Sequence, residues 1–279
     1  MKVFKEVEKL QAFLTQKQNN QIVGFVPTMG ALHKGHLSLI NVAQNENSIV
    51  VVSIFVNPTQ FNNADDLFKY PKSLKQDIDL LKNTSKIIVF APSVNTVYPD
   101  GEKSESFDFN GLEFEMEGKF RSGHFNGVAT VVKRLFEIVK PKNAYFGEKD
   151  FQQLQIIKNM VAKLNLPINI VSCPIFRESS GLAMSSRNAR LSAPLRKEAH
   201  LIYKCLKKVK ADFKKSTPSE LSKYVVKTFH KKPFFKLEYF TIADAETLLQ
   251  ADKIEAHKNY RAFIAIFVDE VRLIDNIAL

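Results

Sequence analysis

Hydrophobic positions along the chain follow two periods, one typical of strands and one typical of helices. Continuous apolar runs predict buried strands at 22–27, 49–56, 86–92, 143–147 and 168–173. Helical spacing of the apolar residues predicts helices at 2–18, 35–46, 66–83, 127–140 and 150–165. Because strands and helices alternate, the pattern predicts a parallel sheet that helices cover on both faces.

The pattern changes after about residue 175. Two predicted helices come first, at 194–215 and 218–231, and three apolar strands follow at 235–243, 260–268 and 270–277. Asp269 and Glu270 lie between the last two strands in the manner of a tight hairpin turn. We therefore expect a Rossmann-like, doubly wound α/β domain over 1–176 and a smaller α+β domain over 177–279.

The composition is that of an ordinary globular protein, with 45% hydrophobic and 25% charged residues. No uninterrupted apolar run approaches the ~18 residues that a membrane-spanning helix needs. The first residues are charged and helically spaced, which is not the pattern of a secretory signal. Cys173 and Cys205 lie far apart and in no CxxC pair, so we expect a cytoplasmic protein rather than a disulfide scaffold.

The net charge of +11 is concentrated in the C-terminal part, where residues 175–279 contribute +8. Much of the excess is lysine on the predicted helix segment 195–215. One interpretation is a solvated helix face, and the other is attraction of anions such as a nucleotide or a nucleic acid. Aromatic residues do not alternate with the basic ones here, which weighs against nucleic acid. We expect neither a nucleic-acid partner nor a membrane partner.

Two histidines stand at a predicted strand-to-helix junction, in the stretch GFVPTMGALHKGH at 24–36. Ligands of parallel sheets collect at such junctions, where a helix N-terminus offers unpaired N–H groups. Gly30 and Gly35 permit tight turns and close approach of a ligand to the backbone. His33 and His36, three residues apart, could donate ring N–H groups to one anion, and a phosphate chain is the natural choice.

Two other interpretations of the histidine pair stay open. A zinc site needs three or four ligands, and the remaining histidines at 124, 200, 230 and 257 are scattered. The pair could also be ordinary capping or surface histidines.

Two further segments have residues suited to phosphate. GLAMSSRN at 181–188 contains two hydroxyls and a forked guanidinium, Ser185, Ser186 and Arg187. FGEKDFQQL at 146–154 follows a predicted strand and opens a helix, and Lys149 is a candidate phosphate ligand there, with Asp150 as a cap or ribose contact. Each segment alone is a weak signal.

Together, HxGH and a later MSSR loop resemble the paired HIGH and KMSKS signatures of class I nucleotidyltransferases. The surrounding residues narrow the resemblance to one family: VPTMGALHKGHLSLI, SIFVNPTQF, YPKSLKQDIDLL, RSGHFNGVATVVKRLFEIVKP, YFGEKDFQQL and RESSGLAMSSRNARLS. These segments are similar to the pantoate–β-alanine ligase family in order and spacing. The resemblance covers the whole chain and is densest between residues 23 and 193.

The resemblance implies ATP-dependent condensation of pantoate with β-alanine to pantothenate. It implies a pantoyl-adenylate intermediate, release of pyrophosphate and then AMP, Mg²⁺ on the phosphates, a homodimer and a C-terminal domain that acts as a lid. By resemblance, the catalytic residues are His36, His33, Lys149, Ser185, Ser186 and Arg187. The residues that bind ATP would be Met29, Gly30, Ala31, Leu32, His33, Lys34, Gly35, His36, Gly147, Glu148, Lys149, Asp150, Phe176, Met184, Ser185, Ser186 and Arg187.

The resemblance also assigns Gln60 and Gln153 to pantoate, and neutral amides suit its hydroxyls because they both donate and accept. Phe55 and Phe146 could pack on the methyl groups of pantoate. Asp77 is the expected protein ligand of the metal.

The chain departs from the family at two positions. Phe176 stands where a small aliphatic is usual, and Lys72 stands where the family commonly has arginine.

Two rival functions keep part of this pattern. A different HxGH transferase, acting on a phosphorylated acceptor such as phosphopantetheine, would use the histidines and the serine loop but not the glutamine pair. An RNA-binding protein would use the basic C-terminal part and would not need His36. Arg121 and His124 lie in RSGHFNG, which either starts the helix predicted at 127 or contacts substrate.

Overall fold

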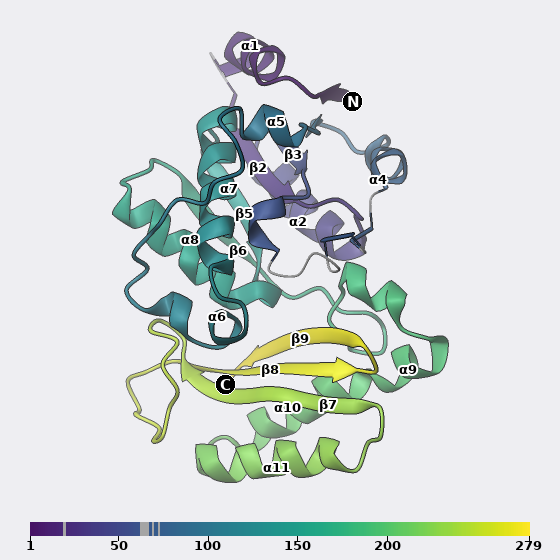
Figure 1. Cartoon of the computed structure of the whole chain (residues 1–279), viewed down its shortest axis with the longest axis vertical. Helices are drawn as coiled ribbons and strands as arrows, with labels where there is room; N and C mark the ends of the chain where they lie inside the picture. The colour runs from purple at the N-terminus through teal and green to yellow at the C-terminus, as the bar shows by residue number, and fades with distance from the viewer. Residues whose placement is uncertain (19–20, 62–66, 69, 72) are drawn as a thin grey trace. The chain divides into compact units, whose positions relative to one another are not determined.

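The computed structural model describes residues 1–18, 21–61, 67–68, 70–71 and 73–279, which form two compact units (Figure 1). The larger unit comprises 1–113, 117–148 and 153–174. The smaller unit comprises 114–116, 149–152 and 175–279. No helix in the part of the chain that the structure describes is long and apolar enough to cross a bilayer.

The larger unit contains a six-stranded sheet in the order β1-β4-β3-β2-β5-β6, with every neighbouring pair parallel. Its strands are β1 Lys2–Phe4, β2 Val23–Thr28, β3 Ile49–Ile54, β4 Ile87–Phe90, β5 Asn143–Gly147 and β6 Asn169–Cys173. Strands β3 and β4 extend the sheet on one side of β2, and β5 and β6 extend it on the other. The strand order therefore reverses between β2 and β5, where open α/β sheets bind ligands at their carboxyl ends.

Helices cover both faces of this sheet, as the sequence predicts. Val26 on β2 packs in one core cluster with Ile40 and Ala43 of α2. The next residue back, Phe25, meets Phe136 of α7 at 6.1 Å between ring centroids, because successive strand side chains point to opposite faces. The larger helices are α1 Val7–Gln18, α2 Lys34–Glu46, α4 Leu74–Leu81, α7 His124–Val139 and α8 Phe151–Lys163, and short turns are α5 Val94–Val97, α6 Glu117–Phe120, η1 Pro58–Gln60, η2 Leu112–Phe114 and η3 Glu148–Asp150.

The prediction of a helix from residue 2 is wrong at its start. Residues Lys2–Phe4 form β1, which pairs with β4, and α1 begins only at Val7. Unpaired backbone groups at the edge of β4 favour an extended partner over the local helical spacing. Of the predicted helix 66–83, α4 covers Leu74–Leu81. The start of the predicted helix, at residue 66, lies outside the described residues.

The smaller unit is an antiparallel sheet, β7-β8-β9, with helices packed on it. Its elements are η4 Ser186–Arg190, α9 Ala193–Glu198, α10 His200–Asp212, α11 Pro218–His230, β7 Phe235–Asp244, β8 Tyr260–Val268 and β9 Val271–Ala278. The predicted hairpin turn is confirmed, since Val268 pairs with Val271 and Asp269 takes a left-handed φ of 54°. The predicted helix 194–215 is divided into α9 and α10 at Ala199.

Both parts of the predicted fold class are therefore confirmed: a parallel sheet flanked by helices and a small antiparallel α+β part. The lid function of residues 177–279 stays a prediction.

Candidate functional site

The loop between β2 and α2 makes a tight left-handed turn. Gly30 has a φ of 82° and Ala31 a φ of 50°. A Cβ at Gly30 would lie 3.0 Å from Oδ2 of Asp77, so the turn leaves no room for a side chain there. Ala31 lacks glycine's freedom, and a left-handed alanine persists only where its surroundings hold it.

Asp77 on α4 supplies that restraint. Its carboxylate is 2% exposed, Oδ2 accepts from the Ala31 N–H at 3.0 Å, and Oδ1 accepts from the Leu32 N–H at 2.7 Å. Hydrogen bonds to a charged acceptor are the strong ones, so Asp77 anchors the loop. The family resemblance predicts a metal-ligating role for Asp77, and that role stays a prediction: the structure shows each of its oxygens accepting one backbone N–H. In the described stretches of the chain, no group of three or more His, Cys, Asp and Glu residues is placed to hold a metal.

His33 and His36 cap α2 reciprocally. His33 is the N-cap residue, and its Nδ1 accepts from the Gly35 N–H at 3.1 Å. His36 Nδ1 accepts from the His33 N–H at 3.2 Å, and the two ring centroids are 4.0 Å apart. An Nδ1 that accepts carries no proton, so these two hydrogen bonds favour the tautomer with hydrogen on Nε2 in both rings.

The capping interpretation is thus compatible with anion binding, because the two functions use different ring nitrogens. Capping occupies Nδ1 of His33 and of His36, whereas donation to an anion would use Nε2. The same arrangement fixes the orientation of both rings at a helix N-terminus, where the helix dipole favours negative charge.

Gln60 follows β3 in η1 and is held from several directions. Its side chain is 9% exposed, Oε1 accepts from Asn57 Nδ2 at 3.1 Å, and Nε2 lies 3.0 Å from Met29 Sδ. Its carbonyl oxygen lies 2.8 Å from Nδ1 of His124 and accepts from Arg121 at 3.4 Å. These contacts favour the structural interpretation of Arg121 and His124, which support the Gln60 segment from the turn before α7 and from the first residue of α7.

Asn57, which no sequence motif singles out, organises this segment. Asn57 is 1% exposed, donates to the Gly127 carbonyl at 3.2 Å and accepts from the Tyr98 hydroxyl at 2.8 Å. Burial raises the pKa of Tyr98, which keeps its hydroxyl protonated as a donor. The available signal was a polar residue directly after the apolar run 49–56.

The candidate residues of the larger unit follow neighbouring strands. The histidine pair follows β2, Gln60 follows β3, and Gly147 ends β5, which pairs with β2. Glu148 comes next, and Gln153 lies half-buried in the first turn of α8. Because the carboxyl ends of parallel strands share one edge, these residues belong to the edge at which the strand order reverses. Phe55 and Phe146 are both core residues with 5% exposure.

The remaining candidate residues lie in the smaller unit. Ser185 is the N-cap of η4, and its hydroxyl accepts from the Arg187 N–H at 3.2 Å. Ser186, Arg187 and Met184 are half-buried, and the Met184 N–H donates to the Phe176 carbonyl at 3.0 Å. The Phe176 side chain is 38% exposed. Lys149 Nζ lies 3.6 Å from the exposed carboxylate of Asp150.

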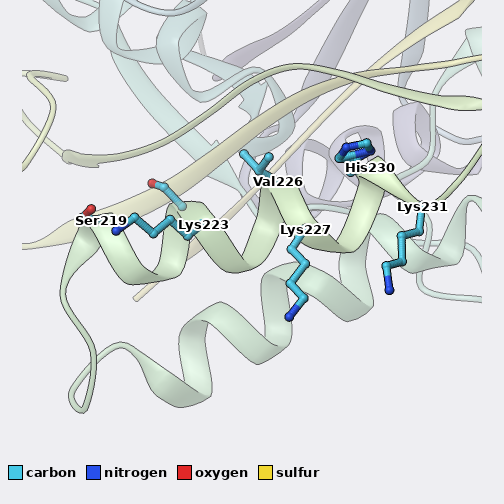
Figure 2. Close-up of a pocket in the computed structure, with 7 residues that line it drawn as sticks. Ser219, Lys223, Val226, Lys227, His230 and Lys231 are labelled. Atoms are coloured by element: carbon cyan, nitrogen blue, oxygen red, sulfur yellow. The ribbon is translucent and has the colours of Figure 1, made fainter.

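An open groove of about 520 Å³ lies along α11, where Lys223, Lys227 and Lys231 recur one turn apart around exposed Val226 (Figure 2). It is lined by Ser219, Ser222, Lys223, Val226, Lys227, His230 and Lys231. None of the candidate site residues borders it. Part of the basic excess of the C-terminal half is therefore a stripe on one helix face.

Comparison with known proteins gives matches along the whole chain. The family model described as pantoate-beta-alanine ligase matches residues 2–278. A pantothenate synthetase of Christiangramia forsetii is 55% identical over 281 residues, covering 100% of this chain and 99% of its own. One from Flavobacterium psychrophilum is 53% identical over 263 residues, covering 94% of this chain and 93% of its own.

Solved structures agree with the fold. Pantothenate synthetase from Thermus thermophilus superposes with a TM-score of 0.90 at 40% identity and covers 99% of both chains. The pantoate-beta-alanine ligase of Francisella tularensis, solved with an ATP compound and β-alanine, gives a TM-score of 0.83 at 39% identity. It covers 100% of this chain and 97% of its own.

Proposed function

The chain belongs to the pantoate–β-alanine ligase family, and from that premise we propose that it makes pantothenate through a pantoyl-adenylate intermediate. A carboxylate oxygen of pantoate attacks the α-phosphorus of ATP, and pyrophosphate leaves. The amine of β-alanine then attacks the acyl carbon, and the acyl–oxygen bond breaks to release AMP. A carboxylate is a poor acyl donor, and adenylation supplies its leaving group.

The reciprocal Nδ1 caps of His33 and His36 are the observation that carries this proposal. They favour Nε2–H donors on both imidazoles at the start of α2. Donors that are already oriented stabilise the charge that develops on the phosphates without reorganising. The turn at Gly30 is anchored by Asp77 and leads directly into the N-terminus of α2. The backbone of Met29–Leu32 can therefore border the nucleotide beside the two histidines.

Pantoate binding is assigned to the two glutamines. An amide donates and accepts at once, so Gln60 and Gln153 can bond the hydroxyls of pantoate and leave its carboxylate unneutralised for attack. The contacts of Gln60 with Asn57 and Met29 hold its amide in one orientation, which favours a defined position of the reacting oxygen.

ATP binding extends in this proposal to the smaller unit. By the family resemblance, Lys149, Ser185, Ser186 and Arg187 bind phosphates of ATP, with Arg187 offering a forked donor. ATP enters as its Mg²⁺ complex, and the phosphates supply the metal's main ligands, as is common for this ion. In this proposal Asp77, whose two oxygens each accept one backbone N–H, acts on the loop rather than on the metal.

The test is AMP release with ATP, Mg²⁺, pantoate and β-alanine, with each component omitted in turn. AMP that depends on both organic substrates supports the ligase. Transfer to a phosphorylated acceptor without them would support the rival transferase, and salt-sensitive RNA binding without AMP would support the third function.

Two substitutions of His36 separate its capping of α2 from its proposed hydrogen-bond donation to the phosphates. Asparagine can place Oδ1 where Nδ1 accepts, so His36→Asn keeps the cap and lacks the Nε2–H. Glutamine can place its amide where Nε2 lies, so His36→Gln keeps a donor and loses the cap. We expect His36→Asn to lower kcat by about 10²–10³ with native stability. His36→Gln should lose about 1 kcal/mol of stability and keep more of the rate. Equal rates for both variants would refute the assigned donor.

The family resemblance also leads us to propose a homodimer and a cytoplasmic location. Sedimentation of the purified chain tests the first, and fractionation of the source cells tests the second.

A further inference from the structure

Strand β9 contains two adjacent polar residues in an otherwise apolar setting. Asp275 is 4% exposed and Asn276 is 2% exposed. Burying a carboxylate and an amide is costly unless both find partners. Successive residues of a strand face opposite sides, so the two residues can hold two different parts of the smaller unit.

Asp275 holds the segment that leads into the serine loop. Its carboxylate accepts hydrogen bonds from both terminal nitrogens of Arg177, at 2.7 and 3.0 Å. The same guanidinium donates to the Gly181 carbonyl at 3.1 Å and lies 3.6 Å from the centroid of the Tyr203 ring. Arg177 also pairs with Ala183 in an antiparallel bridge, directly before Met184. The ion pair therefore fixes one end of the Met184–Arg187 segment.

The turn that precedes the Met184–Arg187 segment is tightly constrained. Gly181 has a φ of 96°, and a Cβ there would lie 2.8 Å from Cδ1 of Tyr203. The other end is held by Asn188, whose side chain donates to the carbonyl of Ala183 at 3.1 Å and to Glu178 at 2.8 Å. Ser185–Arg187 thus lie between two fixed points.

Asn276 holds the second segment. Its Nδ2 donates to the Lys149 carbonyl at 2.9 Å, and its Oδ1 accepts from Arg261. Arg261 in turn lies 4.0 Å from the centroid of the Phe151 ring. The Lys149 backbone is therefore tied to β9, and the Phe151 side chain is held by Arg261 of β8. Every residue in these contacts belongs to the smaller unit.

We propose that Asp275 and Asn276 are positioning residues for ATP, which hold the Lys149 segment and the Ser185–Arg187 segment in a fixed relation through one strand. This inference rests on the proposed function of those two segments. Adenylate formation develops charge on the phosphates, so it depends on the placement of the cations and hydroxyls. A misplacement of 1 Å can lower such a rate by about 10²-fold.

Two conservative variants each remove one of these contacts. Asn276→Asp removes the donor to Lys149 and keeps the acceptor for Arg261. Arg177→Lys keeps a positive charge beside Asp275 and loses the fork. Glu238→Gln is the matched control, because the Arg272–Glu238 ion pair also joins β9 to another strand, β7, and its two side chains are 22% and 17% exposed. Both residues of that pair lie on strands of the sheet, outside the Lys149 segment and outside the Ser185–Arg187 segment.

Two half-reactions give the decisive comparison. Pyrophosphate release from ATP and pantoate measures adenylate formation, and pantothenate release from preformed pantoyl adenylate and β-alanine measures the second step. We expect Asn276→Asp and Arg177→Lys to slow the first step about 10–100-fold and the second less than about threefold. Glu238→Gln should leave both steps unchanged. An equal loss in both steps, or no greater loss than in Glu238→Gln, would overturn the inference.

Hydrogen exchange of the chain without substrates gives a readout that is independent of activity. Asn276→Asp should speed exchange around 145–155, and Arg177→Lys should speed it around 177–190, whereas Glu238→Gln should change neither. Unchanged exchange in both segments would overturn the inference. A wild-type chain that released no pyrophosphate would refute the proposed function alone, and the exchange result would still decide the positioning.

Discussion

Replacing Gly127 by alanine should displace Gln60. Gly127 lies in the first turns of α7, where the helix passes directly over η1. A Cβ at this position would lie 2.3 Å from the carbonyl oxygen of Thr59 and 3.0 Å from Cα of Gln60. Both neighbours are backbone atoms, so no side-chain rotation can relieve the contact.

The size of the displacement follows from these distances. Ordinary contact at a Cβ begins at 3.4 Å, so the helix and the Thr59 carbonyl must separate by about 1 Å, which typically costs about 1–3 kcal/mol. The Gln60 carbonyl would then lose its 2.8 Å contact with His124. A shift of this size in Gln60, the residue proposed to bind pantoate, can lower kcat/KM by up to about 10²-fold.

Steady-state AMP release with varied pantoate measures the effect. We expect the KM for pantoate to rise by about 10–100-fold in Gly127→Ala, with the KM for ATP nearly unchanged. The control is Ala129→Gly in the same helix, whose buried methyl loss should lower stability by about 1 kcal/mol or more without pushing on η1. Urea unfolding measures the free energy of unfolding of both variants, so that a rise in KM can be separated from a loss of stability. A wild-type KM for pantoate in Gly127→Ala, or the same rise in Ala129→Gly, would refute the reasoning.

Two further predictions concern buried ionisable groups, the carboxylate of Asp77 and the thiols of the two cysteines. Asp77→Asn removes the charge that holds the Ala31 and Leu32 N–H groups, and it should lower the free energy of unfolding by about 1–3 kcal/mol and slow AMP release. The Mg²⁺ concentration for half-maximal rate should stay at its wild-type value, and a large rise would restore Asp77 as a metal ligand. Burial raises the pKa of Cys173 and of Cys205 to about 11, so both are thiols rather than thiolates at pH 8. Mass spectrometry should find neither modified by iodoacetamide in the native chain and both modified in urea, and rapid native labelling would contradict their burial.

The strands of the larger unit were predictable because their burial is two-sided. The run 49–56 is apolar at nearly every position, and β3 occupies Ile49–Ile54 with both faces covered. The C-terminal hairpin was equally predictable, since Asp269 tolerates the left-handed φ that the turn needs. In both cases the residues of the segment itself were enough to predict its structure.

The element boundaries were less predictable where distant contacts decide them. Helix α7 begins at His124 rather than 127, because the buried ring of His124 contacts the Gln60 carbonyl. Asn126 and Gly127 have low helix propensity, so the local sequence argues against this turn. Tertiary contact supplies what propensity lacks.

In the candidate site, too, local motifs were predictable and long-range contacts were not. The HxGH spacing indicates the histidine pair, but histidine is not among the usual capping residues, so the reciprocal cap has no standard sequence signal. The bonds from Asp77 to Leu32 and from Asn276 to Lys149 join positions 45 and 127 residues apart. Periodicity and motif spacing describe near neighbours along the chain, so they do not reveal such pairs.

Pantoate labelled with ¹⁸O in its carboxylate tests the central claim most directly. If the carboxylate attacks the α-phosphorus and β-alanine then attacks the acyl carbon, one labelled oxygen must stay on phosphorus when the acyl–oxygen bond breaks. Mass spectrometry of the products should therefore find one ¹⁸O in AMP and none in pyrophosphate. Unlabelled AMP, or ADP with labelled inorganic phosphate, would contradict the account.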